Sequence, residues 1–483
     1  MGFIAALLSK KGTDVSPLIS RMLRSASPNR ADGYGVADCE NVTHSARPPD
    51  PPNFESSAMI GYKFVKVMPL DPTQPVSQHG YTMIFDGRLW SKTGHSDLQA
   101  AADAIGRDPV EGLRRLIENG NGSYVAATAE RDRIVLGRDH IGVVPLYLGE
   151  NETLAGAASN MKALWSVGME AKPFPPGHVA KLTEDGVKIR CVRTVQQPQT
   201  FEKSMDDAAR ELDAILLESV ESHCQGLFSV PLGFSGGIDS ALIAHYLKRL
   251  GVQVNLVCIG LEGSSELETA ERAAEGLDLP IMVRSFGTSE LEEELDAVLS
   301  SVEEDDPMKV SVALPLLLAV MSRPVHGDRV FFSGNGSDEL FGGYQKYVRQ
   351  YAASKEGASR AMLNDVSKSY LINYERDYKV CADLGVELRL PFADPRIVDF
   401  GLALPLEMRL STDESSPRKP LLRALAKRIG LPDEIVTAQK RAIQYSTGVS
   451  KALNALAMEK GASLHRYLHD RFEKIEGQLS AKA

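Results

Sequence analysis

The stretch VPLGFSGGIDSALIAHYLKRLG, residues 230–251, decides the fold class of this chain. Its apolar beginning predicts a buried strand, and residues 241–250 predict a helix. Between them lies a glycine-rich turn, residues 235–240, whose amide N–H groups and helix dipole can hold a phosphate group. Asp239 in this turn would repel an anion, so a phosphate site with this residue requires a further component.

Composition restricts the kinds of partner that the chain can have. The chain has 483 residues, of which 43% are hydrophobic, and this is enough for two or three domains. A formal net charge of -10 gives no general electrostatic reason to bind nucleic acid or an anionic membrane, so a small polar metabolite is the expected partner. The 5 cysteines have no CxxC spacing, which favours a reducing cytoplasm over a disulfide framework or a zinc site. No apolar run reaches the roughly 20 residues of a membrane span.

The pattern of predicted elements changes along the chain. Up to about residue 193, short apolar runs joined by turns predict a sheet-rich domain. From residue 226 onward strands alternate with helices, which is typical of a parallel sheet with ligands at the carboxyl ends of its strands. After residue 364 the sequence is mostly helical in pattern.

A second glycine turn explains the acid in the first one. In FFSGNGSDELFGGY, residues 331–344, the chain again leaves a strand through glycines and again places an acid, Asp338, at a helix start. Two such acids at one sheet edge would hold Mg²⁺, which neutralises phosphate oxygens. Asp239 would then attract the nucleotide through the metal.

These two motifs, together with ELRLPFADPRIVDFGLALP at residues 387–405, resemble the asparagine synthetase family of ATP pyrophosphatases. RDHIGVVPLY, SNMKALW and FPPGHVAKL in the first part resemble the glutaminase-type domain of the same family. The resemblance implies an α/β protein in which residues 1–195 form an Ntn-type αββα sandwich. Residues 205–483 would form a doubly wound parallel sheet with a helical tail.

The resemblance also implies the chemistry. ATP and Mg²⁺ would adenylate a substrate carboxylate, most simply that of aspartate, and ammonia or an amine would displace AMP to form an amide. Lys440 would neutralise charge on the leaving pyrophosphate, although an ordinary solvated lysine is an open alternative. Lys419, Arg423 and Arg441 belong to the same basic region and cannot be ranked. The predicted ATP-binding residues are Ser235, Gly236, Gly237, Asp239, Ser240, Val257, Ile259, Ser333 and Gly334, with Asp239 and Asp338 as the metal ligands.

Two departures from the family pattern affect the expected activity. Asn335 stands where bacterial asparagine synthetases have a glutamate, and an amide cannot act as a general base. Glu375 is the candidate base, with a plain helix-surface carboxylate as the alternative. At the amino terminus, Gly2 stands where glutamine-using members have a nucleophilic cysteine, and Asp86 replaces an asparagine of the oxyanion hole. The first domain is therefore expected to have lost glutamine hydrolysis.

Three other functions remain open from the sequence. A β-lactam synthetase-like ligase also lacks the cysteine, but DELFGGY resembles asparagine synthetases more closely. A tRNA-thiolating enzyme would need a basic surface and reactive cysteines. A non-catalytic scaffold is disfavoured by the retention of Asp239, Asp338 and Lys440. A homodimer is compatible with the sequence, which does not determine the oligomeric state.

Overall fold

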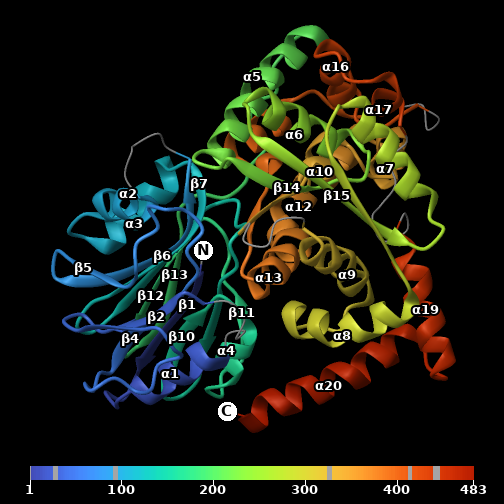
Figure 1. Cartoon of the computed structure of the whole chain (residues 1–483). Coiled ribbons are helices and arrows are strands. Elements are labelled where there is room, and N and C mark those ends of the chain that lie inside the picture. The colour runs from blue at the N-terminus through green and yellow to red at the C-terminus, as the bar shows by residue number, and fades with distance from the viewer. Residues whose placement is uncertain are drawn as a thin grey trace. The chain divides into compact units, whose positions relative to one another are not determined.

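The computed structural model of the chain describes residues 2–25, 31–90, 96–323, 329–411, 416–438 and 447–482. The chain forms two compact units (Figure 1). Unit 1 comprises Met1–Thr194, Ala382–Glu387 and Glu473–Ala483, and unit 2 comprises Val195–Cys381 and Leu388–Phe472. Within the described ranges, none of the helices combines the length and the apolar character that are needed to cross a membrane.

Unit 1 contains two antiparallel sheets that pack against each other. The first has the order β11 (Lys172–Pro173), β9 (Tyr147–Glu150), β10 (Leu154–Ala158), β1 (Gly2–Ser9), β4 (Ala58–Phe64), β2 (Gly33–Ala37) and β3 (Val42–Ser45). The second has the order β13 (Gly186–Cys191), β12 (His178–Thr183), β8 (Ile134–Arg138), β7 (Gly122–Ala129), β6 (Tyr81–Leu89) and β5 (Val76–Gln78). Strand β1 is buried along its whole length because it lies inside the first sheet.

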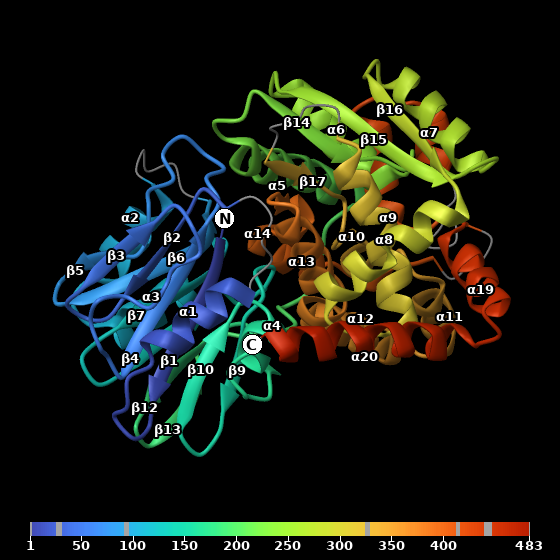
Figure 2. The ribbon, with the colours of Figure 1, turned by 60° about the horizontal axis from the view of Figure 1, so that its bottom comes forward.

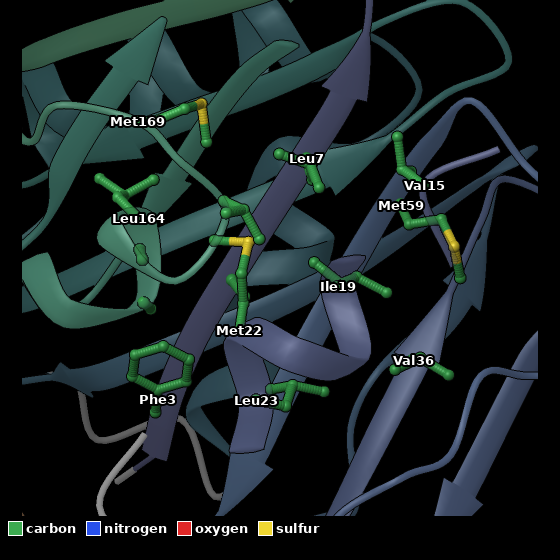
Figure 3. Close-up of a cluster of buried hydrophobic side chains, with 14 of the residues drawn as sticks. Phe3, Leu7, Val15, Ile19, Met22, Leu23, Val36, Met59, Leu164 and Met169 are labelled. Atoms are coloured by element: carbon green, nitrogen blue, oxygen red, sulfur yellow. The ribbon is translucent and has the colours of Figure 1, made fainter. Parts of the chain in front are cut away.

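Helices cover the outer faces of these two sheets. Helices α1 (Ser16–Ser25) and α4 (Met161–Trp165) pack on the first sheet, and α2 (Asp97–Ile105) and α3 (Pro109–Asn119) pack on the second. Figure 3 shows the first of these interfaces, where Ile19, Met22 and Leu23 of α1 lie over Phe3 and Leu7 of β1. The spacing of the three helical residues places them on one face of α1. The predicted αββα sandwich is confirmed.

Unit 2 is built on a sheet of five strands, some of which lie side by side in Figure 2. Their order is β16 (Ile281–Phe286), β15 (Gln253–Leu261), β14 (Ser229–Gly233), β17 (Val330–Phe332) and β18 (Glu387–Arg389). The pairs β14–β15, β14–β17 and β15–β16 are parallel. The strand order therefore runs outward in both directions from β14, which confirms the doubly wound α/β sheet.

The helices after residue 204 agree with the predicted alternation of strands and helices and with the predicted helical tail. Only β18 interrupts the described helical part after residue 364. The bounds are α5 (Met205–Cys224), α6 (Ile238–Arg249), α7 (Ser265–Gly276), α8 (Thr288–Val302), α9 (Pro307–Met321), α10 (Ser337–Phe341), α11 (Gln345–Ala353), α12 (Lys355–Ser369), a π-helical turn (Tyr370–Tyr374), α13 (Glu375–Asp383), a 3₁₀ turn (Pro391–Ala393), α14 (Pro395–Ala403), α15 (Leu406–Arg409), α16 (Pro420–Arg428), α17 (Asp433–Thr437), α19 (Val449–Glu459) and α20 (Leu464–Lys482).

Candidate active site

The two glycine turns lie at the place where the strand order of unit 2 reverses. The first turn follows β14 and the second follows β17, and these two strands are neighbours in the sheet, with Leu232 opposite Phe332. Strands that lead in opposite directions away from such a point leave a crevice at their carboxyl ends, where doubly wound proteins bind ligands. The strand order therefore brings together two motifs that lie about a hundred residues apart in the sequence.

The first turn opens helix α6 without a side-chain cap. Gly236 has a positive φ of 71°, a conformation that favours glycine, and Gly237 is the N-cap residue of α6. A glycine N-cap has no side chain to accept the N–H groups of the first helical turn. These groups and the helix dipole therefore suit an anion, as the sequence predicts. Ser240 lies in this helical turn, and its hydroxyl donates to the carbonyl oxygen of Gly237 at 3.2 Å.

Gly334 brings the second turn against the first. A Cβ atom built on Gly334 would lie 3.0 Å from the Cβ of Asp239 and 3.2 Å from the backbone nitrogen of Ser240. A side chain at this position would require Asp239 or the backbone of Ser240 to shift by a few tenths of an ångström. Gly334 therefore has a packing role in the site, in addition to its predicted place beside the adenosine group.

The two predicted metal ligands meet at one cation. The ammonium group of Lys419 lies 2.6 Å from Oδ1 of Asp239 and 2.6 Å from Oδ1 of Asp338. Both carboxylates therefore lie within reach of a single positive charge. Carboxylate oxygens are the donors that Mg²⁺ prefers, and Mg²⁺ usually takes its other ligands from phosphates and water.

Of the basic residues that the sequence could not rank, Lys419 is the one that contacts both predicted metal ligands. It is 1% exposed, and its ammonium group also donates to the hydroxyl of Ser337 at 2.8 Å. Its separation of 180 positions from Asp239 explains why local pattern did not select it. A Cβ atom on Gly343 would lie 2.6 Å from Cε of Lys419 and would overlap Asp338, so the second glycine of FGGY makes room for this ion pair.

Asn335 has an acidic partner that the sequence analysis did not identify. Its amide nitrogen donates to Oδ2 of Asp377 at 2.6 Å, while its amide oxygen accepts from the backbone N–H of Gly336 at 2.8 Å. Asp377 also accepts from Nε of Arg376 at 2.7 Å. The amide of Asn335 is therefore held at both ends, and the carboxylate next to it belongs to Asp377 on α13.

Glu375 is buried, which excludes the alternative of a helix-surface carboxylate. It is the first residue of α13, directly after the π-helical turn, and is 3% exposed. Its Oε1 lies 3.5 Å from the ammonium group of Lys309, which also donates to Glu304 at 2.6 Å. Burial and a lysine partner are compatible with either a catalytic or a structural role, so the assignment of Glu375 as a base stays a prediction.

Acidic side chains gather on α10, which carries Glu339 next to the predicted metal ligand Asp338. Burial, together with the nearby Asp338 carboxylate, raises the pKa of Glu339. Its Oε1 accepts from the hydroxyl of Tyr344 at 2.6 Å and from the amide of Asn373 at 2.8 Å. Burial and the same Glu339 carboxylate raise the pKa of Tyr344 well above its ordinary value, so the phenol remains a donor. A cation in this region therefore has a favourable electrostatic surrounding.

The other predicted site residues are placed as follows. Val257 and Ile259 are buried on β15, two positions apart and thus on the same face of the sheet. The hydroxyl of Ser333 accepts from the backbone N–H of Asn335 at 3.3 Å and so closes the second turn. Lys440 and Arg441 lie outside the described residues. Arg423 donates to the carbonyl oxygens of Arg418 and Ala438 at 2.6 and 2.7 Å.

In unit 1, other residues of the chain occupy the space around Gly2, one of the two positions that depart from the family pattern. The backbone nitrogen of Gly2 donates to Oδ1 of Asp86 at 2.7 Å, and the hydroxyl of Tyr62 lies 3.5 Å from the same oxygen. A Cβ atom on Gly2 would overlap the phenol ring of Tyr62 and the carbonyl oxygen of Lys63. Burial and the Asp86 carboxylate raise the pKa of Tyr62 well above its ordinary value. Position 2 therefore has no space for a nucleophilic side chain.

Three other polar residues of unit 1 have structural partners. Asp97 accepts from Arg88 at 3.0 Å and from the backbone N–H of Leu89 at 2.9 Å. Arg138 donates to the carbonyl oxygen of Gly142 at 2.8 Å. Asp139 accepts from the backbone N–H groups of Tyr124, Ile141 and Gly142. These contacts connect turns to strands, which agrees with a structural role for the three residues.

Comparisons with known proteins cover both units. The asparagine synthase family model matches residues 211–373 and 351–475, and the glutamine amidotransferase domain model matches residues 73–166. A Methanocaldococcus jannaschii protein, provisionally named glutamine-hydrolyzing asparagine synthetase 1, is 30% identical over 399 residues, which are 72% of this chain and 73% of that protein.

More distant relatives match a smaller part. The glutamine-hydrolyzing asparagine synthetase B of Escherichia coli is 27% identical over 344 residues, or 68% of this chain, and the chain spans 60% of its length. A glutamine phosphoribosylpyrophosphate amidotransferase structure from B. subtilis overlaps 58% of this chain and 65% of its own, with 14% identity and a TM-score of 0.35. An overlap of this size adds nothing to the fold described above.

Proposed function

Because the chain belongs to the asparagine synthase family, we propose that it is an ATP-dependent amide-forming ligase acting on a small carboxylate, most simply aspartate. The observation that carries this proposal is the convergence of Asp239 and Asp338 on one cation at the edge between β14 and β17. Two acids from separate turns repel each other at close range, so their approach to one cation supports a site for positive charge, such as a metal ion that binds phosphate.

The proposed reaction has two steps. The substrate carboxylate oxygen attacks the α-phosphorus of ATP, and pyrophosphate leaves with the electrons of the bond that breaks. An amine then attacks the acyl carbon, AMP leaves, and the amine gives up a proton as the amide forms. Mg²⁺, when bound by Asp239 and Asp338, would supply positive charge to the phosphate oxygens.

The residues of the chain would position and neutralise these groups. The first-turn amides of α6 and the backbone of Ser235, Gly236, Gly237 and Ser240 would cradle the phosphates. Val257, Ile259, Ser333 and Gly334 would surround the adenosine part, and Lys440 would neutralise the pyrophosphate. Glu375 is the proposed acceptor of the amine proton, and Asp377, which binds Asn335, is its nearest competitor in sequence and in position on α13. Comparison of Glu375→Gln with Asp377→Asn would separate these two roles.

We infer that free ammonium or an amine, and not glutamine, supplies the nitrogen. The support is the crowding of position 2 by Tyr62 and the carboxylate of Asp86 at the place where the family uses an amide. A carboxylate there repels the negative charge that develops on the oxygen of a tetrahedral intermediate. A cytoplasmic location fits this proposal, since the five cysteines, all within the described residues, form no disulfide.

The test is pyrophosphate release from ATP and Mg²⁺ in the presence of ammonium and a panel of carboxylates. We expect release with aspartate, equal amounts of AMP, and no release of glutamate when glutamine replaces ammonium. Formation of an amide that needs a carboxylate but no added amine would instead indicate ring closure within one substrate. No release with any carboxylate would contradict the proposal.

A further inference from the structure

The ammonium group of Lys419 is shared by the two predicted metal ligands. Its ammonium group contacts Oδ1 of Asp239 and Oδ1 of Asp338 at 2.6 Å each. Ser337 supplies a third oxygen at 2.8 Å. Three oxygen atoms around one buried cation resemble part of a metal coordination shell, although the cation belongs to the protein.

The backbone at Lys419 is specialised for this placement. Its φ is 64°, in the left-handed region that a residue with a long side chain rarely adopts, and it is the N-cap residue of α16. Such a conformation persists only where surrounding contacts enforce it, and it is most often found at functional sites. Gly343 provides one such contact, because its lack of a side chain leaves space for Cε of Lys419. The chain therefore accepts a backbone cost to bring this ammonium group to the two acids.

The neighbouring cations are engaged elsewhere. Arg418 donates to the carbonyl oxygen of Gly343 at 2.7 Å, and Arg423 donates to the carbonyl oxygens of Arg418 and Ala438. Among the described basic residues of this region, Lys419 forms ion pairs with both acids. It is therefore the group that meets a metal ion when the ion approaches these oxygens.

We propose that Lys419 is an internal counter-cation that competes with Mg²⁺ for Asp239 and Asp338, so that metal and nucleotide bind cooperatively. An ammonium group and a divalent ion cannot both hold the same carboxylate oxygens at close range, because their charges repel. The metal must therefore displace Lys419. A bound triphosphate gives the displaced ammonium group a new anionic partner and lowers the cost of that displacement. This inference rests on the proposed function, because it assumes that the two acids hold a metal.

The competition predicts a coupling between two ligands. Without nucleotide, Lys419 would lower the affinity of the site for Mg²⁺. With nucleotide bound, Lys419 would no longer lower this affinity. Coupling between sites is reciprocal, so the metal would raise the nucleotide affinity by the same factor. A variant that lacks the ammonium group should therefore bind metal more tightly when nucleotide is absent.

The experiment measures Mn²⁺ binding by calorimetry and by electron paramagnetic resonance, with and without α,β-methylene ATP, which cannot release pyrophosphate. For Lys419→Met and Lys419→Gln we expect the Mn²⁺ affinity without nucleotide to rise about tenfold or more. The ratio of the Mn²⁺ affinities with and without the analogue should fall by a similar factor. Lys427→Met, on an exposed position of the same helix α16, is the matched control.

Two different results would overturn the inference and can be distinguished. If the wild type binds Mn²⁺ and the analogue but the neutral variants bind Mn²⁺ no more tightly without nucleotide, Lys419 does not compete with the metal, and the proposed function is unaffected. If the wild type binds neither ligand, both the inference and the proposed function fail. Lys419→Gln retains hydrogen-bonding groups near Ser337, so it provides the measurement if Lys419→Met does not fold.

Discussion

At the scale of single residues, the site depends on charges that are buried and paired. Asp239 and Asp338 share Lys419, and Asn335 is held by Asp377. A buried polar group that loses its partner costs more than the pair contributes. Substitutions at these positions therefore affect both the chemistry and the stability of unit 2, and the two effects must be measured separately.

We expect Asp239→Asn and Asp338→Asn each to abolish pyrophosphate release, because each removes a proposed metal ligand. The fold should remain, with the free energy of unfolding lowered by about 1–3 kcal/mol, since Lys419 keeps one acid and Ser337. Pyrophosphate assays and thermal unfolding check the two parts. Asp185→Asn, an exposed acid in unit 1, should change neither. Near-normal turnover in either site variant would show that the metal site lies elsewhere.

Gly2→Cys should not restore glutamine hydrolysis. The sequence alone names Asp86 as a second obstacle, and the structure adds Tyr62, whose ring occupies the space of a side chain at position 2. We expect no glutamate release from Gly2→Cys or from Gly2→Cys with Asp86→Asn. Losing one oxyanion donor costs about 3 kcal/mol in known enzymes, and these variants also lack space for the cysteine. Full recovery in the single variant, measured as glutamate release, would refute this account of unit 1.

At the scale of elements, the two glycine turns and the start of α16 pack against one another. Gly334 touches the first turn of α6, and Gly343 touches Asp338 and Lys419 at the start of α16. The strands fix where the turns begin, and the glycines allow them to meet. The positions of α6, α10 and α16 are therefore coupled through atoms of the backbone.

Gly334→Ala tests this coupling. A methyl group 3.0 Å from the Cβ of Asp239 forces the first turn of α6 to move. We expect a loss of about 1–3 kcal/mol in the free energy of unfolding, as for other overpacked sites, and at least a hundredfold loss of pyrophosphate release. Gly287→Ala is the control, because a Cβ atom at the N-cap of α8 has no neighbour within 4 Å. Normal activity in Gly334→Ala would show that the two turns do not need to touch.

Helix α5 carries a titratable group that makes stability depend on pH. Burial lowers the pKa of His223 from 6.5 to about 4. In the unfolded chain this imidazole takes up a proton near pH 6.5, whereas the folded protein resists protonation until about pH 4. The unfolded state therefore binds more protons between pH 6.5 and pH 4. The contribution of His223 to the free energy of unfolding is fully present above pH 6.5 and is lost as the pH falls toward 4.

We expect protonation of His223 to lower the free energy of unfolding by about 3 kcal/mol between pH 6.5 and pH 4. The pKa is 6.5 in the unfolded chain and about 4 in the folded protein, and each tenfold difference in proton affinity corresponds to about 1.36 kcal/mol. His223→Gln should flatten this part of the curve of unfolding temperature against pH. The exposed His465→Gln should leave its shape unchanged. An unaltered slope in His223→Gln would contradict the assignment.

How much of the site the sequence predicts depends on how far apart its members lie. The glycine turns, the two acids and the parallel sheet follow from local pattern, because each turn occupies a few consecutive residues. Lys419, Asp377 and Tyr62 did not follow, since their partners are 180, 42 and 24 positions away. Only the fold brings them together. The burial of Glu375 was likewise not visible, because the π-helical turn before α13 shifts the helical periodicity.

At the scale of the whole molecule, unit 1 includes a segment from the second half of the sequence. Residues Ala382–Glu387 belong to it, and Glu387 binds Arg88 through two of its nitrogens at 2.8 and 3.1 Å. Asp71 and Asp97 bind the same guanidinium at 2.5 and 3.0 Å. Unit 1 is therefore complete only when both halves of the chain are present.

Glu387→Gln should weaken unit 1 although the substitution lies far from it in sequence. Breaking a buried ion pair costs about 3–5 kcal/mol, and Arg88 keeps Asp71 and Asp97, so we expect the lower end of this range. Faster hydrogen exchange in β6 would report the change. Asp383→Asn, in the same segment but 3.4 Å from Lys162, should have a smaller effect. Unchanged exchange in β6 would show that the pair with Arg88 is not stabilising.

The distance of 180 positions between Asp239 and Lys419 also has a consequence for the order in which the protein is made. Contacts between remote segments form late in folding, because a long loop must close first. A ribosome adding about 5–20 residues per second would release Lys419 roughly ten to forty seconds after Asp239. Until Lys419 is added, Asp239 has no internal cation, and neither does Asp338 once it has been made. All five strands of the sheet precede Lys419 in the sequence, so the nascent chain contains its sheet-forming segments before it contains the cation that balances the two acids.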